Sequence, residues 1–266
     1  IIKNNVVSPK QYDSIVPYID IDIKGRALYK NRLMMLDLIA NNNWKRPIYF
    51  SGGAYDDEDF LWMKNYLQLD GMTYKLVPIK TEIPKDASPL EMGGIDTDKM
   101  YANVMKWDWG NSESLSIYHD PETRKNSITY RSYLSRLMNQ LILEGKKEKA
   151  KNIITLAMNK MPLEQFGYYS LLEPFAKGYY DLGENAKAQD LLSKLILKYK
   201  ENLKYYSSLT PSDQTSLAID IITDIERYRS LLLVMKESGD VTFYNKNKAQ
   251  FNTYVSIFER FGREKE

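Results

Sequence analysis

Cysteine is absent from this sequence of 266 residues, and histidine occurs once. Without cysteine the chain forms no disulfide, offers no thiolate nucleophile and builds no cysteine-based zinc site, and a single histidine excludes a histidine-rich metal cluster. We therefore expect no metal and no other cofactor. A chain without cysteine is compatible with reducing and oxidising compartments alike, so this absence does not locate the protein.

Long apolar runs are also missing. The longest aliphatic run covers residues 231–235, whereas a helix that crosses a bilayer needs about 18 apolar residues. The sequence starts at Ile1 instead of methionine, and no charged segment followed by an apolar one stands at its beginning. These features predict an excised or processed part of a longer chain, with no membrane span in this part.

Neither sign of charge dominates the sequence. Lys and Arg number 37 against 35 Asp and Glu, which gives a net charge of +2. Such a balance provides no electrostatic footprint for a polyanion, so no nucleic-acid partner is expected. With 43% hydrophobic and 27% charged residues, the composition is typical of a folded globular chain that forms one large domain or two ordinary ones.

The first 80 residues contain patterns of both strands and helices. Alternating isoleucines predict a strand over 18–23, and β-forming residues predict a brief buried strand over 47–50 and another over 73–79. Apolar residues at three- and four-residue spacing predict an amphipathic helix over 26–40. An acidic stretch followed by apolar residues predicts a second helix over 56–70. The order of a strand, a helix and a second strand within about 30 residues matches the size of one βαβ crossover. This order indicates a small α/β layer.

A further short helix is expected from Asp96 to Met105. Asp96 and Asp98 form an Asp-x-Asp element, which in some nucleotide-sugar enzymes holds a divalent ion between carboxylate and diphosphate oxygens. The alternative is that Asp96 caps the helix and Asp98 lies in its first turn, where the helix dipole favours negative charge. We prefer the capping interpretation because it explains both carboxylates without a metal.

After residue 127 the pattern is helical, and two segments resemble one another with Ala150 and Ala188 as equivalent positions. Gly145 and Gly183, each five residues before its alanine, are the expected turns. This pattern resembles the tetratricopeptide repeat, which has two apolar helices, a turn between them and a small residue where the helices cross. The two copies are spaced more widely than in the standard repeat, so we expect an irregular connection over 164–169. The apolar positions are Leu134, Leu137, Leu141, Ile154 and Ala157 in the first copy, and Leu172, Phe175, Tyr179, Leu192 and Leu195 in the second.

A third helix pair is predicted from Pro211 onward. Thr210 suits a helix N-cap, and proline is favoured at the first helical position. Gly239 is the expected turn of this pair. Tyr244 occupies the position of the small residue, so the last helix is interpreted as a divergent capping helix that ends near Phe261.

Together these patterns predict a mostly α fold with a small α/β part. We expect a small α/β domain over residues 1–115 and a helical-repeat, tetratricopeptide-like domain over residues 116–266. Stacked helix pairs bury the apolar surface that a single pair leaves exposed.

Candidates for chemistry are few. His119 is the only imidazole available as a general base near neutral pH, although a solvated turn histidine is the simpler interpretation. The sequence contains no nucleophile elbow, phosphate loop or dinucleotide fingerprint. We therefore assign no catalytic residue.

Aromatic residues provide candidate binding positions instead. Trp107 and Trp109 either form a stacking surface for a sugar ring or a peptide, or cap the junction between the α/β layer and the helix pairs. Tyr168 and Tyr169 lie among the repeat helices, where they belong to the core or line a concave groove. All four are kept as candidate binding residues.

Three motifs, at residues 41–50, 66–78 and 96–101, together resemble the C-terminal soluble region of a bacterial membrane-protein family. That family is catalogued as domain of unknown function 2723 and is similar to protein O-mannosyltransferases, and the resemblance extends over essentially the whole chain. It implies an N-terminal multi-spanning part that resembles a lipid-linked sugar transferase, followed by a tail with tetratricopeptide-like repeats. The transferase's catalytic acid would then lie outside this chain. Arg46 and Tyr49, within the first motif, are further candidate binding residues.

The resulting hypothesis is a non-catalytic accessory and protein-interaction domain of a multi-spanning, glycosyltransferase-like membrane protein. The resemblance places it on the extracytoplasmic, periplasmic side of a bacterial inner membrane. Its expected partners are a protein or peptide acceptor and the transmembrane part of its own full-length chain. The alternative is a stand-alone carbohydrate-active hydrolase with paired carboxylates, such as Asp96 and Asp98, in a cleft beside Trp107 and Trp109.

Overall fold

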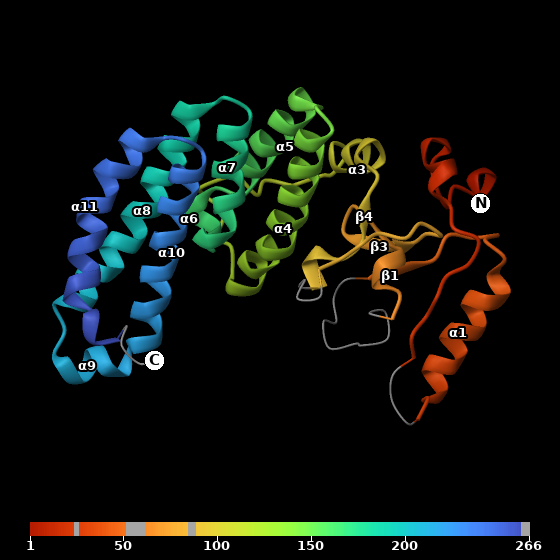
Figure 1. The fold of residues 1–266 in the computed structure, drawn as a ribbon, viewed down its shortest axis with the longest axis horizontal. Coiled ribbons are helices and arrows are strands. Elements are labelled where there is room, and N and C mark those ends of the chain that lie inside the picture. Colours follow the sequence, from red (N-terminus) through yellow and green to blue (C-terminus); the bar gives the residue numbers. More distant parts are fainter. Residues whose placement is uncertain (24–26, 52–61, 85–88, 262–266) are drawn as a thin grey trace. The chain divides into compact units, whose positions relative to one another are not determined.

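The computed structural model describes residues 1–23, 27–51, 62–84 and 89–261. It consists of two compact units, Ile1–Glu144 and Gly145–Glu266, each of which is described by itself (Figure 1). The division at Glu144 lies further along the chain than the boundary expected at residue 115, because a long helix adds to the first unit. The fold is mostly α with a small α/β part, as predicted.

The first unit contains a four-stranded sheet in the order β1-β3-β2-β4. The strands are β1 (Tyr49–Ser51), β2 (Leu67–Asp70), β3 (Thr73–Leu76) and β4 (Gly94–Ile95). β3 is antiparallel to both β1 and β2, and β4 is parallel to β2. The turn between β2 and β3 places Gly71 at φ +71°, a conformation that glycine adopts without steric cost.

The predicted βαβ crossover is wrong. β1 and β3 are direct antiparallel neighbours, so no crossover helix joins parallel strands there. The helix predicted over 56–70 lies partly outside the described residues, and its described part contains a 3₁₀ turn (Lys64–Tyr66) and β2. The segment 18–23 forms no strand. Alternating apolar and polar residues fit a strand with one buried face, but a strand also needs a neighbouring strand as hydrogen-bonding partner. The strand predicted over 47–50 corresponds to β1, but the prediction that it is buried is wrong. β1 lies at the edge of the sheet, and Tyr49 is 46% exposed.

Helices complete the first unit. α1 (Lys30–Asn42) confirms the helix predicted over 26–40, with a later start, but none of its residues is buried. α3 (Thr97–Val104) begins at its predicted cap, Asp96. α4 (Pro121–Leu143) is capped by Asp120, whose carboxylate accepts hydrogen bonds from two backbone amides of the first turn. Two 3₁₀ turns, Ile2–Asn4 and Pro9–Ser14, and a third at Pro89–Glu91 lie in the irregular segments.

One face of the sheet belongs to the core of the first unit. Leu67, Leu69, Tyr74 and Leu76 are at most 1% exposed. The ring of Tyr74 packs edge-on against Tyr133 of α4, with centroids 5.8 Å apart. This contact anchors β3 to the long helix, and it leaves the opposite face of the strands for other side chains.

The described residues of the second unit form helices joined by turns and short irregular connections. Its helices are α5 (Lys147–Lys160), α6 (Leu163–Phe166), α7 (Glu173–Asp181), α8 (Asn185–Ser207), α9 (Pro211–Ser216), α10 (Ala218–Glu237) and α11 (Val241–Ile257), with 3₁₀ turns at Tyr169–Leu172 and Glu259–Phe261. α7 packs on α8, α8 on α10, and α10 on α11, and Figure 1 shows these helices running up and down side by side. The unit is therefore built from stacked helical hairpins.

Local signals in the second unit were predicted well. Gly183 and Gly239 both adopt φ +77° in the turns between α7 and α8 and between α10 and α11. Thr210 caps α9, and its hydroxyl accepts from the amide of Asp213 at 3.3 Å. Ala188 is fully buried on α8. The tetratricopeptide assignment itself stays a prediction, since the first copy is shared between α4 and α5, which belong to different units.

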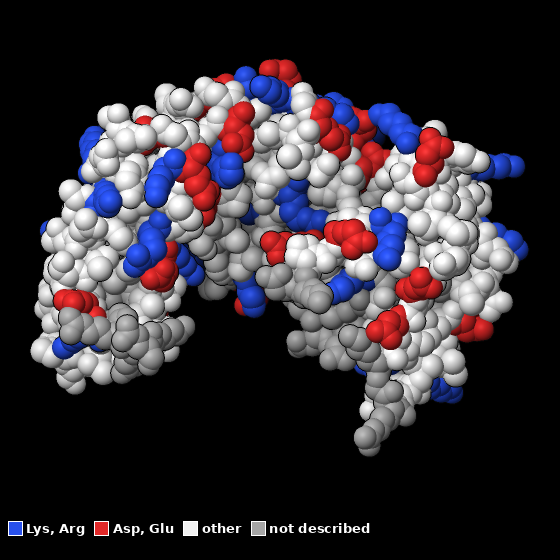
Figure 2. Space-filling model, in the orientation of Figure 1, with Lys and Arg blue, Asp and Glu red and all other residues white. Residues whose placement is uncertain are grey.

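Acidic and basic side chains are interspersed over the surface. On the face that Figure 2 displays, Lys and Arg alternate with Asp and Glu. Pairs one helical turn apart are frequent in α8 and α10, such as Lys194 with Asp190 and Arg229 with Glu226. Exposed pairs of this kind add little stability, so the fold depends chiefly on apolar burial.

Candidate functional site

A polar row crosses the sheet of the first unit on the face opposite to the apolar core. In the register of the strands, Lys75 of β3 lies opposite Tyr49 of β1 and opposite Gln68 of β2. Directly opposite residues share a face of a sheet, and successive residues alternate between faces. Tyr74 and Leu76, on either side of Lys75, are buried in the core. Lys75, Tyr49 and Gln68 therefore point together to the other face.

Asp70, at the end of β2, connects this face to α3. Its carboxylate accepts from Lys99 Nζ at 2.9 Å, from Asn103 Nδ2 at 2.7 Å and from the hydroxyl of Tyr49 at 3.2 Å. The Asp70 side chain is only 7% exposed. A nearly buried carboxylate with three donors is well compensated, so it holds Lys99 and Tyr49 in fixed positions.

Lys75 has a different environment from Lys99. Its side chain is buried, and its ammonium donates to the backbone carbonyl of Asn5. Burial, followed by the neighbouring ammonium of Lys99, lowers the pKa of Lys75 to about 8. Burial acts to lower the pKa of Lys99, but the hydrogen bond to Asp70, the contact with Lys75 and the charges of Asp70 and Tyr49 together outweigh burial, so the pKa of Lys99 is raised. Burial and the adjacent Asp70 raise the pKa of Tyr49.

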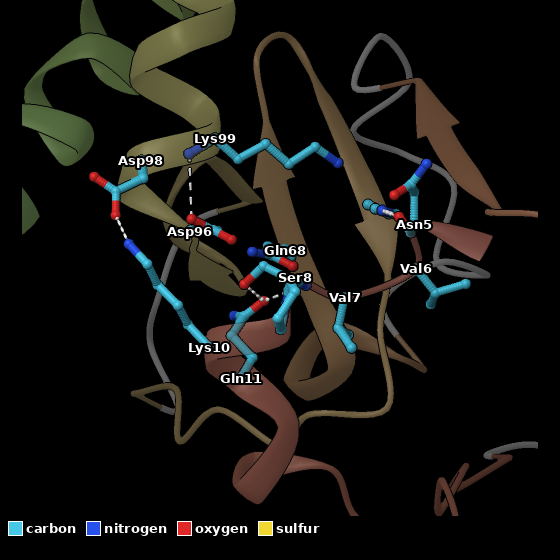
Figure 3. Close-up of a pocket in the computed structure, with 12 residues that line it drawn as sticks. Asn5, Val6, Val7, Ser8, Lys10, Gln11, Gln68, Asp96, Asp98 and Lys99 are labelled. Carbon is cyan, nitrogen blue, oxygen red and sulfur yellow. Dashed lines mark hydrogen bonds and ion pairs between the residues drawn. The ribbon is translucent and has the colours of Figure 1, made fainter. Parts of the chain in front are cut away.

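A cavity of about 630 Å³ opens over this polar row (Figure 3). Its wall consists of the N-terminal segment 5–11 on one side, and of Gln68, Lys75, Asp96, Asp98 and Lys99 on the other. In Figure 3, Lys10 reaches Asp98 at one end of the cavity, and Asn5 and Val6 lie at the opposite end. A volume of this size and mixed lining are typical of sites for small ligands.

Both aspartates of the Asp-x-Asp element have structural partners. Asp96 caps α3, since its Oδ1 accepts from the amide of Lys99 at 3.2 Å. Asp98 forms an ion pair with Lys10. The capping interpretation is therefore confirmed. In the described parts of the chain, no three acidic or histidine side chains are arranged to hold a metal ion.

Trp107 and Trp109 form an aromatic cluster with Tyr130 of α4. The three rings lie 5.4 to 5.7 Å apart between centroids, and both tryptophans are half-buried. The indole Nε1 of Trp109 is buried and has no hydrogen-bond partner among the described residues. The two indole rings thus pack against Tyr130 in the first half of α4 and do not line the cavity, and a role in binding stays a prediction.

The other predicted residues are dispersed. Arg46 is exposed and lines a separate groove beside α1, whereas Tyr49 is part of the polar row. Tyr168 and Tyr169 belong to the second unit, where Tyr168 is 39% exposed at φ +49° in the irregular connection before α7. His119 Nε2 lies 3.0 Å from the carbonyl oxygen of Ser112, in accordance with a turn histidine.

The sequence prediction missed Lys75, Lys99 and Asp70. The signal that could have found two of them is the alternation in residues 67–76, which places Gln68, Asp70 and Lys75 on one face of a hairpin. The helix predicted over 56–70 includes the first half of this hairpin and so conceals the alternation. Lys99 and the N-terminal segment join the site only through tertiary packing, for which no local signal exists.

The cavity lies within a region of recognisable sequence similarity. Residues 1–99 match the family model described as TMEM260-associated domain 2. No curated protein and no solved structure shows significant similarity to the chain. In the part of the chain that the structure describes, no helix is both long and apolar enough to cross a membrane. The N-terminal part of this chain, which carries the polar cavity, is thus similar to an accessory domain associated with a membrane protein.

Proposed function

We propose that this chain is a non-catalytic accessory and protein-interaction domain of a multi-spanning, glycosyltransferase-like membrane protein, on the extracytoplasmic, periplasmic side of the membrane. The observation that carries the proposal is the match of residues 1–99 to a domain associated with TMEM260. The first unit attaches to the membrane-embedded part of the parent protein, and the helical second unit binds a protein or peptide acceptor.

The exposed apolar face of α1 supports attachment to another protein part. Leu33, Met34 and Leu38 are 57%, 56% and 69% exposed, and α1 buries none of its residues. Met34 and Leu38 line an apolar groove of about 500 Å³ together with Ile48 and Phe50. Contiguous exposed apolar surface of this kind marks an interaction site. The transmembrane part of the same full-length chain is its proposed occupant, because the matching family is associated with a membrane protein.

The hairpins of the second unit support the proposed acceptor binding. α7, α8, α10 and α11 stack in sequence order, and stacked helix pairs present extended surfaces that bind peptide segments. Apolar side chains remain on the outside of these helices, among them Leu197 and Leu233, each about half exposed. Such residues are suited to contact an extended acceptor.

The hydrolase alternative gains no support from the described residues. A glycosidase needs two carboxyl groups that flank one bond, one as acid and one as base or nucleophile. Asp96 is engaged as a helix cap and Asp98 in an ion pair with Lys10, and neither tryptophan lies beside them in the cavity. The accessory function is therefore the proposal that we retain.

The attachment is tested in the full-length parent protein in membranes. Leu38→Glu places a charge on the exposed face of α1 and is expected to lower sugar transfer at least about fivefold, through loss of apolar contact area. Leu115→Glu is the matched control, because Leu115 is 80% exposed in the same unit and lies outside α1. Equal activity of the two variants would contradict the proposed attachment.

Acceptor binding is tested with the 266-residue chain alone. Fluorescence anisotropy with labelled extended peptides from extracytoplasmic proteins is expected to show saturable binding that Leu233→Glu weakens. A peptide of scrambled sequence serves as the control. Absence of binding, together with full transfer activity after deletion of this region from the parent protein, would remove the proposal.

A further inference from the structure

The cavity of the first unit contains a buried cation without an acidic partner. Lys75 is 2% exposed, and within the described parts of the chain its ammonium donates to the backbone carbonyl of Asn5. Among the described residues Lys75 forms no ion pair with a carboxylate, whereas the nearby Lys99 pairs with Asp70 at 2.9 Å. A buried ammonium that lacks a counter-charge is costly, and groups of this kind cluster at functional sites.

The charged groups around Lys75 leave its ammonium only partly compensated. Tyr49 faces it from β1, with the ammonium 5.8 Å from the centre of the ring. Lys99 on α3 repels it, while the charges of Asp70 and Asp96 attract it more weakly. The net effect with burial is a pKa of about 8, so the group is still mostly protonated at neutral pH.

The two lysines share the wall of one cavity. Lys75 and Lys99 line the same space of about 630 Å³, closed on one side by the N-terminal segment (Figure 3). The amide group of Gln68 offers a further donor there, whereas the hydroxyl of Ser8 donates to Gln11 Oε1 at 3.2 Å. Asp98 is engaged with Lys10 and Asp96 with the start of α3, so neither carboxylate serves as the counter-charge of Lys75.

We propose that this cavity binds a small oxyanion, a carboxylate or phosphate group, between the ammonium groups of Lys75 and Lys99. The oxygen atoms of such a group would supply the counter-charge that Lys75 lacks and reduce the repulsion between the two lysines. The two carboxylates in the wall, Asp96 and Asp98, disfavour ligands with several negative charges, so the ligand carries one charged group on an otherwise neutral body. This site is independent of the proposed accessory function.

Isothermal titration calorimetry of the 266-residue chain with inorganic phosphate and, separately, with acetate tests the site. Saturable binding at millimolar concentration or below is expected for at least one probe, and the stronger of the two identifies the preferred oxyanion. With acetate, whose charge is constant above neutral pH, affinity is expected to fall at least about fivefold from pH 7 to about pH 9.5, as Lys75 loses its proton. A pH-independent affinity would contradict the role of Lys75.

Lys75→Met is the decisive variant, because it removes the charge and keeps most of the side-chain volume. It is expected to weaken binding at least about tenfold, and it should fold, since loss of an uncompensated buried charge is seldom destabilising. Lys194→Met is the control, because Lys194 is exposed on α8 and pairs with Asp190. Retained binding in Lys75→Met, or the same loss in both variants, would overturn the proposal.

A second measurement uses the unaltered protein and does not depend on the folding of a variant. Amine acylation followed by mass spectrometry gives the labelling rate of each lysine. Phosphate or acetate, whichever binds, is expected to slow the labelling of Lys99, whose side chain is 39% exposed, at least about threefold and to leave Lys194 unchanged. Uniform labelling rates with and without the anion would contradict a site in this cavity.

Discussion

The guanidinium of Arg136 donates a hydrogen bond of 2.9 Å to the backbone carbonyl of Gly93, immediately before β4. The same side chain, which extends from α4, also donates to the carbonyls of Met92 at 2.8 Å and Leu90 at 2.9 Å, and to the hydroxyl of Tyr74 at 3.2 Å. One arginine thus satisfies three carbonyls of an irregular segment and ties it to the helix and to β3. This segment leads through β4 to α3, whose first turn lines the cavity.

Arg136→Met is expected to lower the free energy of unfolding of the first unit by about 2 to 3 kcal/mol, because it leaves carbonyls without their charged donor. Chemical denaturation followed by tryptophan fluorescence measures this, since all four tryptophans lie before Glu144. Arg46→Met is the control, because Arg46 is exposed in the same unit, and its effect should stay within about 0.5 kcal/mol. Equal changes in the free energy of unfolding for the two variants would mean that the hydrogen bonds of Arg136 do not stabilise the first unit.

Gly93 itself tolerates no side chain. It has φ +70°, and an added Cβ would lie 2.3 Å from the backbone oxygen of Leu67 on β2. Gly93→Ala is therefore expected to cost at least about 2 kcal/mol more than Gly110→Ala, whose φ is +54° but whose Cβ position is open. Both variants incur the same left-handed strain, so their difference isolates the clash. Urea denaturation followed by circular dichroism and fluorescence checks it, and equal costs would contradict the close approach of Gly93 to β2.

Sequence patterns predicted helix ends better than sheet partners, for a physical reason. A cap such as Asp96 or Thr210 acts within one helical turn, and a turn glycine such as Gly183 acts on its own backbone, so both signals are local. Strand pairing instead joins distant residues. The isoleucines of 18–23 alternate as a strand would, but no neighbouring strand pairs with them in the described fold.

The candidate site was hard to predict for the same reason. Lys75 resembles an ordinary strand residue until the register places it beside Tyr49 and Gln68. Its acceptor Asn5 lies 70 residues earlier in the chain, and Lys99 comes from a helix beyond the sheet. Of the predicted binding residues, only Tyr49 belongs to this polar row, because its motif includes the edge strand.

Glu173 gives the second unit a predictable dependence on pH. Burial raises the pKa of this carboxyl above its ordinary value of 4.5, opposed in part by a hydrogen bond from Ser230 Oγ at 2.7 Å and reinforced by Glu237. The folded state therefore binds more protons than the unfolded state once the pH rises past 4.5, and the free energy of unfolding falls as the pH increases up to the raised pKa. Glu173 thus contributes more stability on the acid side of this window.

Glu173→Gln removes the titrating group and keeps an acceptor for Ser230. It is expected to flatten the decline in melting temperature across this pH window, as measured by circular dichroism at a series of pH values. Asp181→Asn is the control, since Asp181 is exposed and paired with Lys177 one turn away. A decline that persists unchanged in Glu173→Gln would show that burial of this carboxyl does not set the pH dependence.

The helix pair α7 and α8 provides the sharpest test of the repeat interpretation, because α8 carries two alanines in contrasting environments. Ala188 is fully buried, whereas Ala186, two positions earlier, is exposed. Enlarging a buried alanine forces the packed helices apart, so Ala188→Leu is expected to lower the free energy of unfolding by about 1 to 3 kcal/mol. Ala186→Leu introduces the same side chain at the surface of the same helix. Leucine is nearly as good a helix former as alanine, so this variant should change the free energy of unfolding by less than about 0.5 kcal/mol. Thermal unfolding followed by circular dichroism distinguishes them, and an Ala188→Leu variant as stable as the unaltered protein would mean that the alanine is not needed for close approach of the helices.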